Sequence, residues 1–272
     1  MKDSGMKELV ERVALPCRDD GVRFTDESRL NAIASELRGT GWQLWKSDTL
    51  CRVYASEGFD PAKPTLVFSS HVDMVARRCY ADCREEVWQG SFDNLITNAA
   101  LVWDMKNGRL GPQVLVAFTG DEEENSGGAD QVAHILSGNN VDVRFVVVTD
   151  VTEEGWGAGK HFTVENVFPD EVQDVADALS WILPAVADLD RHPTVIVEGD
   201  ADEAWDYDEF DLPCCSVCLP CYGDMHSEQG VEVRPESVAL YAEVLARLGG
   251  DGINDMLPRC VGCLGRFPMP WR

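Results

Sequence analysis

Hydrophobic and polar positions along the chain fall into two alternating kinds of segment. Three runs are apolar nearly throughout and have the length of buried strands, at 65–70, 114–119 and 144–149. Elsewhere apolar residues recur every three to four positions, which predicts helices at 6–15, 26–37, 93–105, 129–136, 170–183 and 235–248. Apolar strands separated by helices indicate a mainly parallel sheet covered on both faces. We therefore expect an α/β fold, a three-layer αβα arrangement around a central mixed, mostly parallel sheet.

Shorter stretches predict further strands at the margins of this sheet. Residues 42–45 and 50–55 alternate in the manner of a strand pair, and 161–164 and 194–197 have the composition of two more strands. Seven acidic residues then fall between positions 200 and 211. A dense acidic run is usually a solvated loop, and a role in cation binding is the alternative.

The first apolar run ends abruptly in His71-Val72-Asp73. Side chains alternate along a strand, so His71 and Asp73 point the same way, toward the crevice where open α/β sheets bind their ligands. The alternative is a core histidine bonded to a carboxylate for purely structural reasons. The motif alone does not decide between the two.

Other buried segments also end in acids or histidine. Asp93 lies at a helix start after Ser91, Glu122 and Glu123 follow the second apolar run, Asp150 follows the third, and His226 lies farther along. Carboxylates and imidazoles that converge in one crevice need a compensating charge, because each unpaired buried anion costs several kcal/mol. Divalent cations supply it. Nitrogen and oxygen ligands suit Zn²⁺ first, with Mn²⁺ or Co²⁺ as alternatives, and one carboxylate bridging two ions would hold them ~3.5–4 Å apart.

These residues, in this order, resemble the co-catalytic di-zinc exopeptidase superfamily, which includes aminopeptidases, tripeptidases and carboxypeptidase-like deacylases. That superfamily has His-x-Asp, a bridging Asp at a helix start, Glu-Glu in a strand-to-glycine turn, Asp, and a distal His. The corresponding segments here are His71-Val-Asp73, Ser91-Phe-Asp93-Asn94, Gly120-Asp-Glu122-Glu123-Glu-Asn-Ser-Gly-Gly128, Val148-Thr-Asp150 and Asp224-Met-His226-Ser-Glu.

The resemblance implies a role for each residue. Asp93 would bridge two metal ions, with His71 and Asp150 completing one site and Glu123 and His226 the other. Glu122 would be the general base, which needs a pKa near the working pH. Asp73 would bond the far nitrogen of His71 and fix its tautomer.

Two features depart from the pattern or leave its register open. Asn94, which is uncharged, follows the bridging Asp93, where relatives often have Asp or an aliphatic residue. The glutamate run has a third member, Glu124, so the register could shift by one. We choose Glu122 and Glu123 because residues 125–129 then align with the glycine-rich tail of relatives.

The spacing of the motifs leaves no room for the additional domains of larger relatives. His71 and Asp93 are 22 positions apart, and Asp150 and His226 are 76 apart. We therefore expect residues 1–272 to form a single catalytic domain without a lid or an inserted β domain. The resemblance implies a binuclear exopeptidase of small peptides, most simply an aminopeptidase. The alternatives are a deacylase or amidohydrolase acting on N-acyl amino acids and a non-catalytic metal-binding relative.

Charge and hydropathy argue against some classes of binding partner. The formal net charge is −25 and the pI is near 4.4, which argues against nucleic acid or an anionic membrane as a partner. No stretch reaches the ~18 apolar residues of a membrane span, and charges interrupt the N-terminal region where a signal peptide needs an apolar core. We expect a cytoplasmic protein that binds a small peptide or an N-acyl amino acid. The sequence leaves its oligomeric state open.

The ten cysteines form a separate question. Four of them have zinc-ligand spacing and predict a possible structural zinc site, namely Cys218, Cys221, Cys260 and Cys263. Free or partly oxidised thiols in a cysteine-rich loop are the alternative.

Overall fold

The computed structural model describes residues 4–18, 27–84, 86–166, 182–190 and 192–250. Its helices are α1 Ser4–Val13, α2 Ser28–Glu36, α3 Phe92–Lys106, α4 Gly127–Gly138, α6 Glu203–Glu209 and α7 Pro235–Leu248. Its strands are β1 Trp42–Ser47, β2 Cys51–Ser56, β3 Thr65–His71, β4 Ala81–Asp82, β5 Trp88–Gly90, β6 Val114–Thr119, β7 Val143–Thr152, β8 Thr163–Glu165, β9 Thr194–Val195, β10 Cys214–Pro220 and β11 Val231–Val233. The elements expected around the three apolar runs are therefore confirmed.

Eight strands form one mixed sheet in the order β1-β2-β6-β3-β7-β10-β8-β9. Its middle is parallel, because β6, β3, β7 and β10 run the same way. The β1–β2 pair joins β6 antiparallel, and β8 joins β10 antiparallel. Every residue of β3 and β6 is buried, which explains why these two strands lack polar alternation in the sequence.

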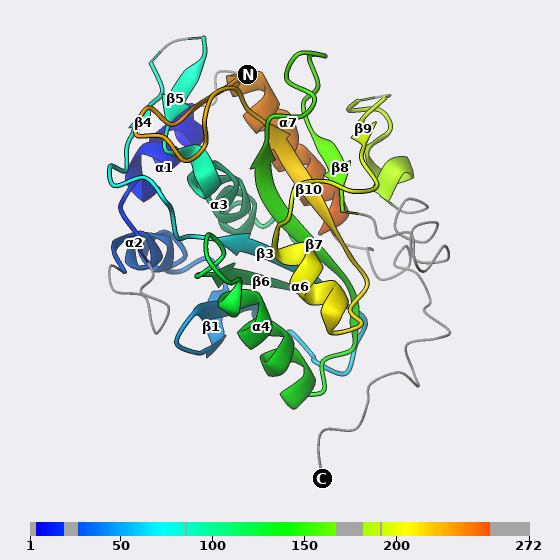
Figure 1. The fold of residues 1–272 in the computed structure, drawn as a ribbon. Helices are drawn as coiled ribbons and strands as arrows, with labels where there is room; N and C mark the ends of the chain where they lie inside the picture. The colour runs from blue at the N-terminus through cyan, green and yellow to red at the C-terminus, as the bar shows by residue number, and fades with distance from the viewer. Residues whose placement is uncertain (1–3, 19–26, 85, 167–181, 191, 251–272) are drawn as a thin grey trace.

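Helices cover both faces of the sheet (Figure 1). On one face α3 packs between α1 and α7, with α2 beside α1 and α3. On the other face α4 and α6 lie against each other and against the strands. Each face has its own buried core: Phe68, Phe118 and Tyr241 belong to the α3 side, and Val67, Val146 and Tyr207 to the α6 side. The expected three-layer α/β architecture is confirmed.

The acidic run is not the solvated loop that we expected. Residues 203–209 form α6, with Asp202 as a cap whose side chain accepts a hydrogen bond from the Ala204 N–H. Asp202 and Glu203 are buried, as are Ala204 and Tyr207 on the inner side of the helix. The prediction was wrong because tertiary packing turned one side of an acidic segment inward, and composition alone does not report that.

Other differences come from pairing between distant segments. β10 lies in the cysteine-rich stretch that we had considered as a loop, between β7 and β8. Strands β4, β5 and β11 form a small second sheet, and β11 pairs with β5 across more than 140 positions of sequence. Most of the helix predicted at 170–183 lies outside the described residues.

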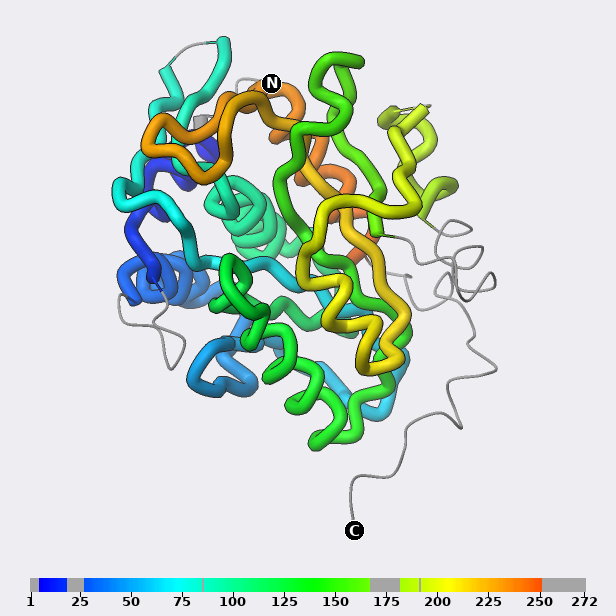
Figure 2. Tube along the Cα trace, viewed as in Figure 1, coloured from blue at the N-terminus to red at the C-terminus, as the bar shows by residue number. Residues whose placement is uncertain are grey.

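The tube view shows how the chain arrives at one edge of the sheet (Figure 2). The segment after β3, the turn after β6 and the turn after β10 all lie on the side of the molecule that faces the reader. None of the helices in the described part of the chain is both long and apolar enough to cross a membrane.

Candidate metal centre

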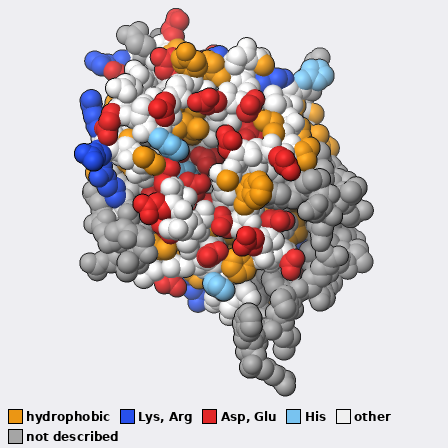
Figure 3. Space-filling model, in the orientation of Figure 1, with side chains coloured by type: hydrophobic (Ala, Val, Ile, Leu, Met, Phe, Trp, Pro, Cys, Tyr) orange, Lys and Arg blue, Asp and Glu red, His pale blue; other side chains and the backbone are white. Residues whose placement is uncertain are grey.

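Five separate segments bring acids and histidines to the carboxyl-terminal edge of the parallel strands. His71 is the last residue of β3, Asp93 lies in the first turn of α3, and Asp150 lies near the end of β7. Glu122 and Glu123 follow β6, and His226 lies in the turn between β10 and β11. Parallel strands end at one edge, so their distant sequence positions become neighbours. Figure 3 shows acidic side chains gathered around a recess on this face.

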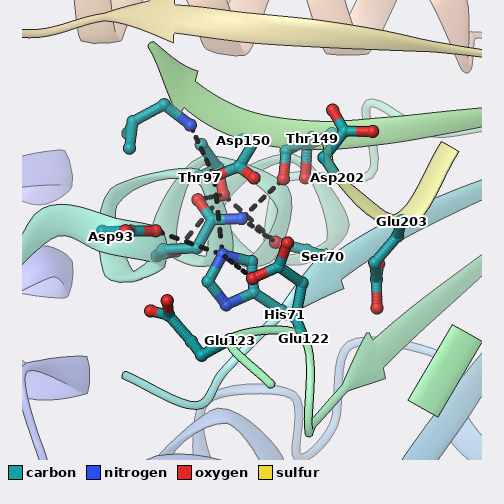
Figure 4. Close-up of polar contacts among 12 residues, drawn as sticks. Ser70, His71, Asp93, Thr97, Glu122, Glu123, Thr149, Asp150, Asp202 and Glu203 are labelled. Atoms are coloured by element: carbon teal, nitrogen blue, oxygen red, sulfur yellow. Dashed lines mark hydrogen bonds and ion pairs between the residues drawn. The ribbon is translucent and has the colours of Figure 1, made fainter. Parts of the chain in front are cut away.

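His71 is buried at the centre of the cluster (Figure 4). Its Nε2 lies 3.1 Å from an oxygen of Asp93, 3.5 Å from Asp150 and 3.9 Å from Glu122. Its Nδ1 faces Asp73 at 3.5 Å. The opposite oxygen of Asp73 accepts a hydrogen bond from the backbone N–H of Glu123 at 3.2 Å. Asp73 thereby connects His71 with the glutamate turn.

Asp93 faces both histidines, one with each carboxylate oxygen. Its Oδ1 lies 3.1 Å from Nε2 of His71, and its Oδ2 lies 3.7 Å from Nε2 of His226. His226 also lies 3.2 Å from Glu123. The His226 side chain is 57% exposed whereas that of His71 is 2% exposed. His226 therefore lies at the mouth of the recess and His71 at its floor.

Hydrogen bonds from α3 hold the ends of β3 and β7 beside Asp93. The Asn94 side chain donates to the Thr149 carbonyl at 2.6 Å, and the Asn98 side chain donates to the His71 carbonyl at 2.7 Å. Asn98 also donates to the Ser70 hydroxyl at 2.9 Å. The uncharged Asn94, which directly follows Asp93, therefore links α3 to β7.

Two sets of side chains share Asp93 and have ligand atoms within 4.8 Å of one another. One set is His71, Asp93 and Asp150, and the other is Asp93, Glu123 and His226. A third set joins His71 to Glu122 and Glu123. All seven residues singled out from the sequence lie in or beside these sets, while Glu124 is exposed. Five of the seven residues are carboxylates, namely Asp73, Asp93, Glu122, Glu123 and Asp150. In the described residues, no lysine or arginine forms an ion pair with any of them.

Burial strongly raises the pKa values of the two glutamates in the cluster, Glu122 and Glu123. It raises the pKa of Glu122 to about 10, and Asp150, Glu203 and Glu123 add to the rise while His71 opposes it. Burial and the neighbouring Asp93 likewise raise the pKa of Glu123 to about 8. Both shifts arise because like charges crowd a poorly solvated site.

The same crowding acts on His71 and its partners. Burial alone would lower the pKa of His71, but Glu122 and Asp150 raise it well above its ordinary value. Burial raises the pKa of Asp150. For Asp73, the contacts with His71 outweigh burial and lower the pKa. The cluster thus favours bound positive charge, whether protons or cations.

Two buried acids near this cluster were not singled out from the sequence. Asp202 and Glu203 lie beside the cluster at the start of α6 (Figure 4). The Ser216 hydroxyl donates to Asp202, and the Ser69 hydroxyl donates to Glu203 at 2.7 Å. Their signal in the sequence was an Asp capping position followed by Ala204 and Tyr207 at helical spacing.

The cysteine prediction is only partly within the described residues. Cys218 and Cys221 are buried free thiols, while Cys260 and Cys263 lie outside the described residues. Cys221 packs in the core on the α3 side. Cys218, three positions earlier in an extended segment, faces the opposite side of the sheet. This arrangement does not favour one ion shared by the pair.

Comparisons with known proteins identify the fold. No protein-family profile matches the chain, and no curated protein matches its sequence. Among solved structures, a TET aminopeptidase from a marine sediment archaeon of the Thaumarchaeota superposes with a TM-score of 0.70 at 10% identity, covering 93% of this chain and 98% of that chain. An aminopeptidase from the archaeon Desulfurococcus kamchatkensis gives a TM-score of 0.66 at 10% identity, covering 96% and 99%. A tripeptidase from Staphylococcus aureus gives 0.65 at 11% identity, covering 90% and 96%.

These likenesses confirm the zinc-exopeptidase-like fold expected from the motifs. Identity this low does not carry activity, substrate or metal from those proteins to this chain.

Proposed function

We propose that this protein is a binuclear metal-dependent exopeptidase acting on small peptides, most simply an aminopeptidase. The observation that carries the proposal is the position of Asp93, whose two oxygens face His71 and His226 on opposite sides. A carboxylate in that position can bridge two cations. Both sets of candidate ligands consist of nitrogen and oxygen donors, which suit Zn²⁺, Mn²⁺ or Co²⁺.

The donor atoms fit such ions. Both ring nitrogens of His71 and one oxygen of Glu123 are buried without a hydrogen-bond partner. Buried polar atoms are rarely left so, because each unmet group costs about 1–3 kcal/mol. His71 and Asp150 would hold one ion and Glu123 and His226 the other, with Asp93 shared.

Bound cations would polarise the scissile carbonyl and activate water for attack. Glu122 would accept the proton of that water and deliver it to the leaving amine, since it lies beside His71 and is not needed to complete either set around Asp93. Glu122 can act as a base only when Asp150 and Glu123 are charge-compensated, because those carboxylates help to raise its pKa. Asp73 would orient the His71 ring from its Nδ1 side.

A hydrolysis screen with paired substrates tests the proposal. The purified protein is treated with chelator, then reloaded with Zn²⁺, Mn²⁺ or Co²⁺, and offered aminoacyl-anilides and dipeptides, their N-acetylated counterparts, and N-acyl amino acids. Metal-dependent turnover of the free-amine member of each pair supports an aminopeptidase. Turnover of N-acyl amino acids would instead support a deacylase. Stoichiometric cation binding without turnover of any substrate would favour a non-catalytic metal-binding protein.

The single-domain organisation belongs to the same proposal. A lid formed by the described residues would cover the recess, whereas the His226 side chain at its mouth is more than half exposed. Limited proteolysis that yields one stable fragment, with the cation affinity of the intact chain, would support one catalytic domain.

A further inference from the structure

We propose that Arg29 is a positioning residue that sets the geometry of the candidate metal centre from inside the protein. Arg29 lies in α2, away from the cluster in sequence, and its side chain is completely buried. No carboxylate of the described residues forms an ion pair with it. Its guanidinium instead donates to two backbone carbonyls and contacts two sulfur atoms.

The energetic cost of this arrangement indicates a role in addition to stability. Removing a cation from water without a counter-charge costs several kcal/mol, and neutral acceptors recover only part of that. A buried arginine that forms no ion pair with an acid of the described residues is therefore explained better by what its donors hold in place.

One donor holds the peptide between Val72 and Asp73, which directly follows His71-Val72. Nη1 of Arg29 lies 2.9 Å from the Val72 carbonyl oxygen. The Val72 N–H continues the sheet by donating to the Thr119 carbonyl at 2.8 Å, but the carbonyl lies beyond the end of β3. The hydrogen bond from Arg29 fixes the direction of the Val72 carbonyl. The orientation of this peptide controls where Asp73 points relative to the His71 ring.

The other donors hold the segment that follows. Nη2 contacts the sulfur atoms of Met74 at 3.5 Å and Cys79 at 3.3 Å, and Nε donates to the Leu15 carbonyl at 3.0 Å. One planar group thus joins the end of α1 to both ends of residues 74–79. The fork of donors in a guanidinium is rigid, so these contacts fix directions as well as distances.

Residues 77–80 in turn contact the two segments that carry Asp93 and His226. The Ser91 hydroxyl donates to the Arg78 carbonyl at 2.6 Å, and Ser91 lies two positions before Asp93. The backbone N–H groups of Arg77 and Arg78 donate to the Glu228 carboxylate at 2.9 and 3.1 Å, and Glu228 lies two positions after His226. Arg29 therefore acts on His71 through Val72 and on Asp93 and His226 through this segment.

Three variants test the inference. Arg29→Met keeps the volume and removes every donor, and Arg29→Lys keeps the charge with a single donor group. Arg12→Met is the matched control, because Arg12 joins α1 to Glu36 of α2 at 2.7 Å without touching β3. The first readout is the imidazole nitrogen NMR signals of His71 in cation-free protein, assigned by their loss in His71→Gln among the five histidines. The second is Co²⁺ affinity and absorption spectrum. The third is urea unfolding.

We expect Arg29→Met to shift the His71 ring signals, to weaken Co²⁺ binding about 10–100-fold and to alter its spectrum, as loss of residues that orient ligands does. It should unfold at a lower urea concentration than wild type, because the Leu15 and Val72 carbonyls lose their donor. Arg29→Lys should have ring signals and a Co²⁺ affinity between those of wild type and Arg29→Met. Arg12→Met should match wild type in ring signals and Co²⁺ binding. Unchanged ring signals and affinity in Arg29→Met, or equal changes in Arg12→Met, would overturn the inference.

Two further outcomes remain informative. If Arg29→Met does not fold, Arg29→Lys decides, because wild-type ring signals and affinity in that variant would overturn the inference. Only the Co²⁺ readout rests on the proposed function. If wild type binds no cation, the proposed function fails, while the His71 ring signals still decide whether Arg29 positions the end of β3.

Discussion

Two groups of buried or partly buried acids lie side by side in this molecule and differ in what satisfies their carboxylate oxygens. In the first, Asp93, Glu122, Glu123 and Asp150 face one another and two histidines, and several of the buried atoms have no hydrogen-bond partner. In the second, Asp202 and Glu203 accept hydrogen bonds from hydroxyls and from a backbone N–H, and one oxygen of Glu203 has no hydrogen-bond partner. The first group is incomplete without added positive charge, whereas fixed donors largely satisfy the second.

This difference helps to distinguish carboxylates suited to cation binding from carboxylates that stabilise the fold. Burial raises the pKa in both groups, to about 10 for Glu122 and to about 7 for Asp202 and for Glu203. A raised pKa alone therefore does not mark the site. Ligand atoms that face one another without donors are the better marker, because added positive charge is needed to satisfy several acceptors that point at one another.

The largest effect that would sharpen this comparison is expected from Glu122→Gln. The amide keeps the size of the side chain but cannot accept a proton, so turnover should fall about 10²–10⁴-fold. Cation content, measured by metal analysis, should stay at the wild-type level because Glu122 is not needed to complete either set around Asp93. Full turnover in this variant would remove Glu122 from the proposed mechanism.

Cation removal should distinguish the two groups next. A ligand at 100 times its Kd stabilises the folded state by about 2.7 kcal/mol, so chelation should lower the free energy of unfolding by about that amount. Asp93→Asn should make stability insensitive to chelator, and Asp202→Asn should leave the chelator effect unchanged. Urea titrations with and without chelator provide the measurement. A chelator effect that survives in Asp93→Asn would contradict a bridging role.

A smaller effect is expected in the second group from Asp202→Ala. This change removes the cap of α6 and leaves the Ser216 hydroxyl without its acceptor, so the free energy of unfolding should fall by about 1–2 kcal/mol. Co²⁺ affinity should remain that of wild type. If Co²⁺ affinity fell together with stability, the two groups would not be independent.

The smallest effect at pH 5 is expected from Glu203→Gln, since the amide oxygen can still accept from the Ser69 hydroxyl. Burial raises the pKa of Glu203 to about 7, so the folded wild type holds this proton more tightly than the unfolded chain. The Glu203 contribution to wild-type stability therefore falls as pH rises from about 4.5 to 7, and the variant lacks this loss. The variant should gain stability relative to wild type across that window in urea titrations. A constant difference would show that Glu203 does not titrate there.

Much of the fold could be predicted from the local pattern of apolar and polar residues. The apolar runs that became β3, β6 and β7 lack polar alternation because helices cover both of their faces, and this pattern is visible in the sequence. The acids and histidine at the ends of these runs were visible for the same reason. A polar residue that interrupts an apolar run has to face a crevice or find a partner.

The segments that sequence reasoning missed or misassigned share one cause. β10 and β11 are defined by partners far away in the chain, and α6 is acidic on its outer side but buried at Asp202 and Glu203. Neither composition nor periodicity reports a partner that lies as far away as β7 is from β10 or β5 is from β11. The role of Arg29 is also invisible locally, because its acceptors lie at Leu15 and Val72.

The sequence by itself determined which residues could meet, their order along the chain and the α/β class, because hydrophobic periodicity and motif spacing are local properties. Only the tertiary structure decided which atoms face each other. It placed one oxygen of Asp93 toward His71 and the other toward His226, and it made α6 a buried neighbour of the cluster. The physical reason is that these distances depend on how strands end at a common edge and on hydrogen bonds between remote segments, which no stretch of sequence contains.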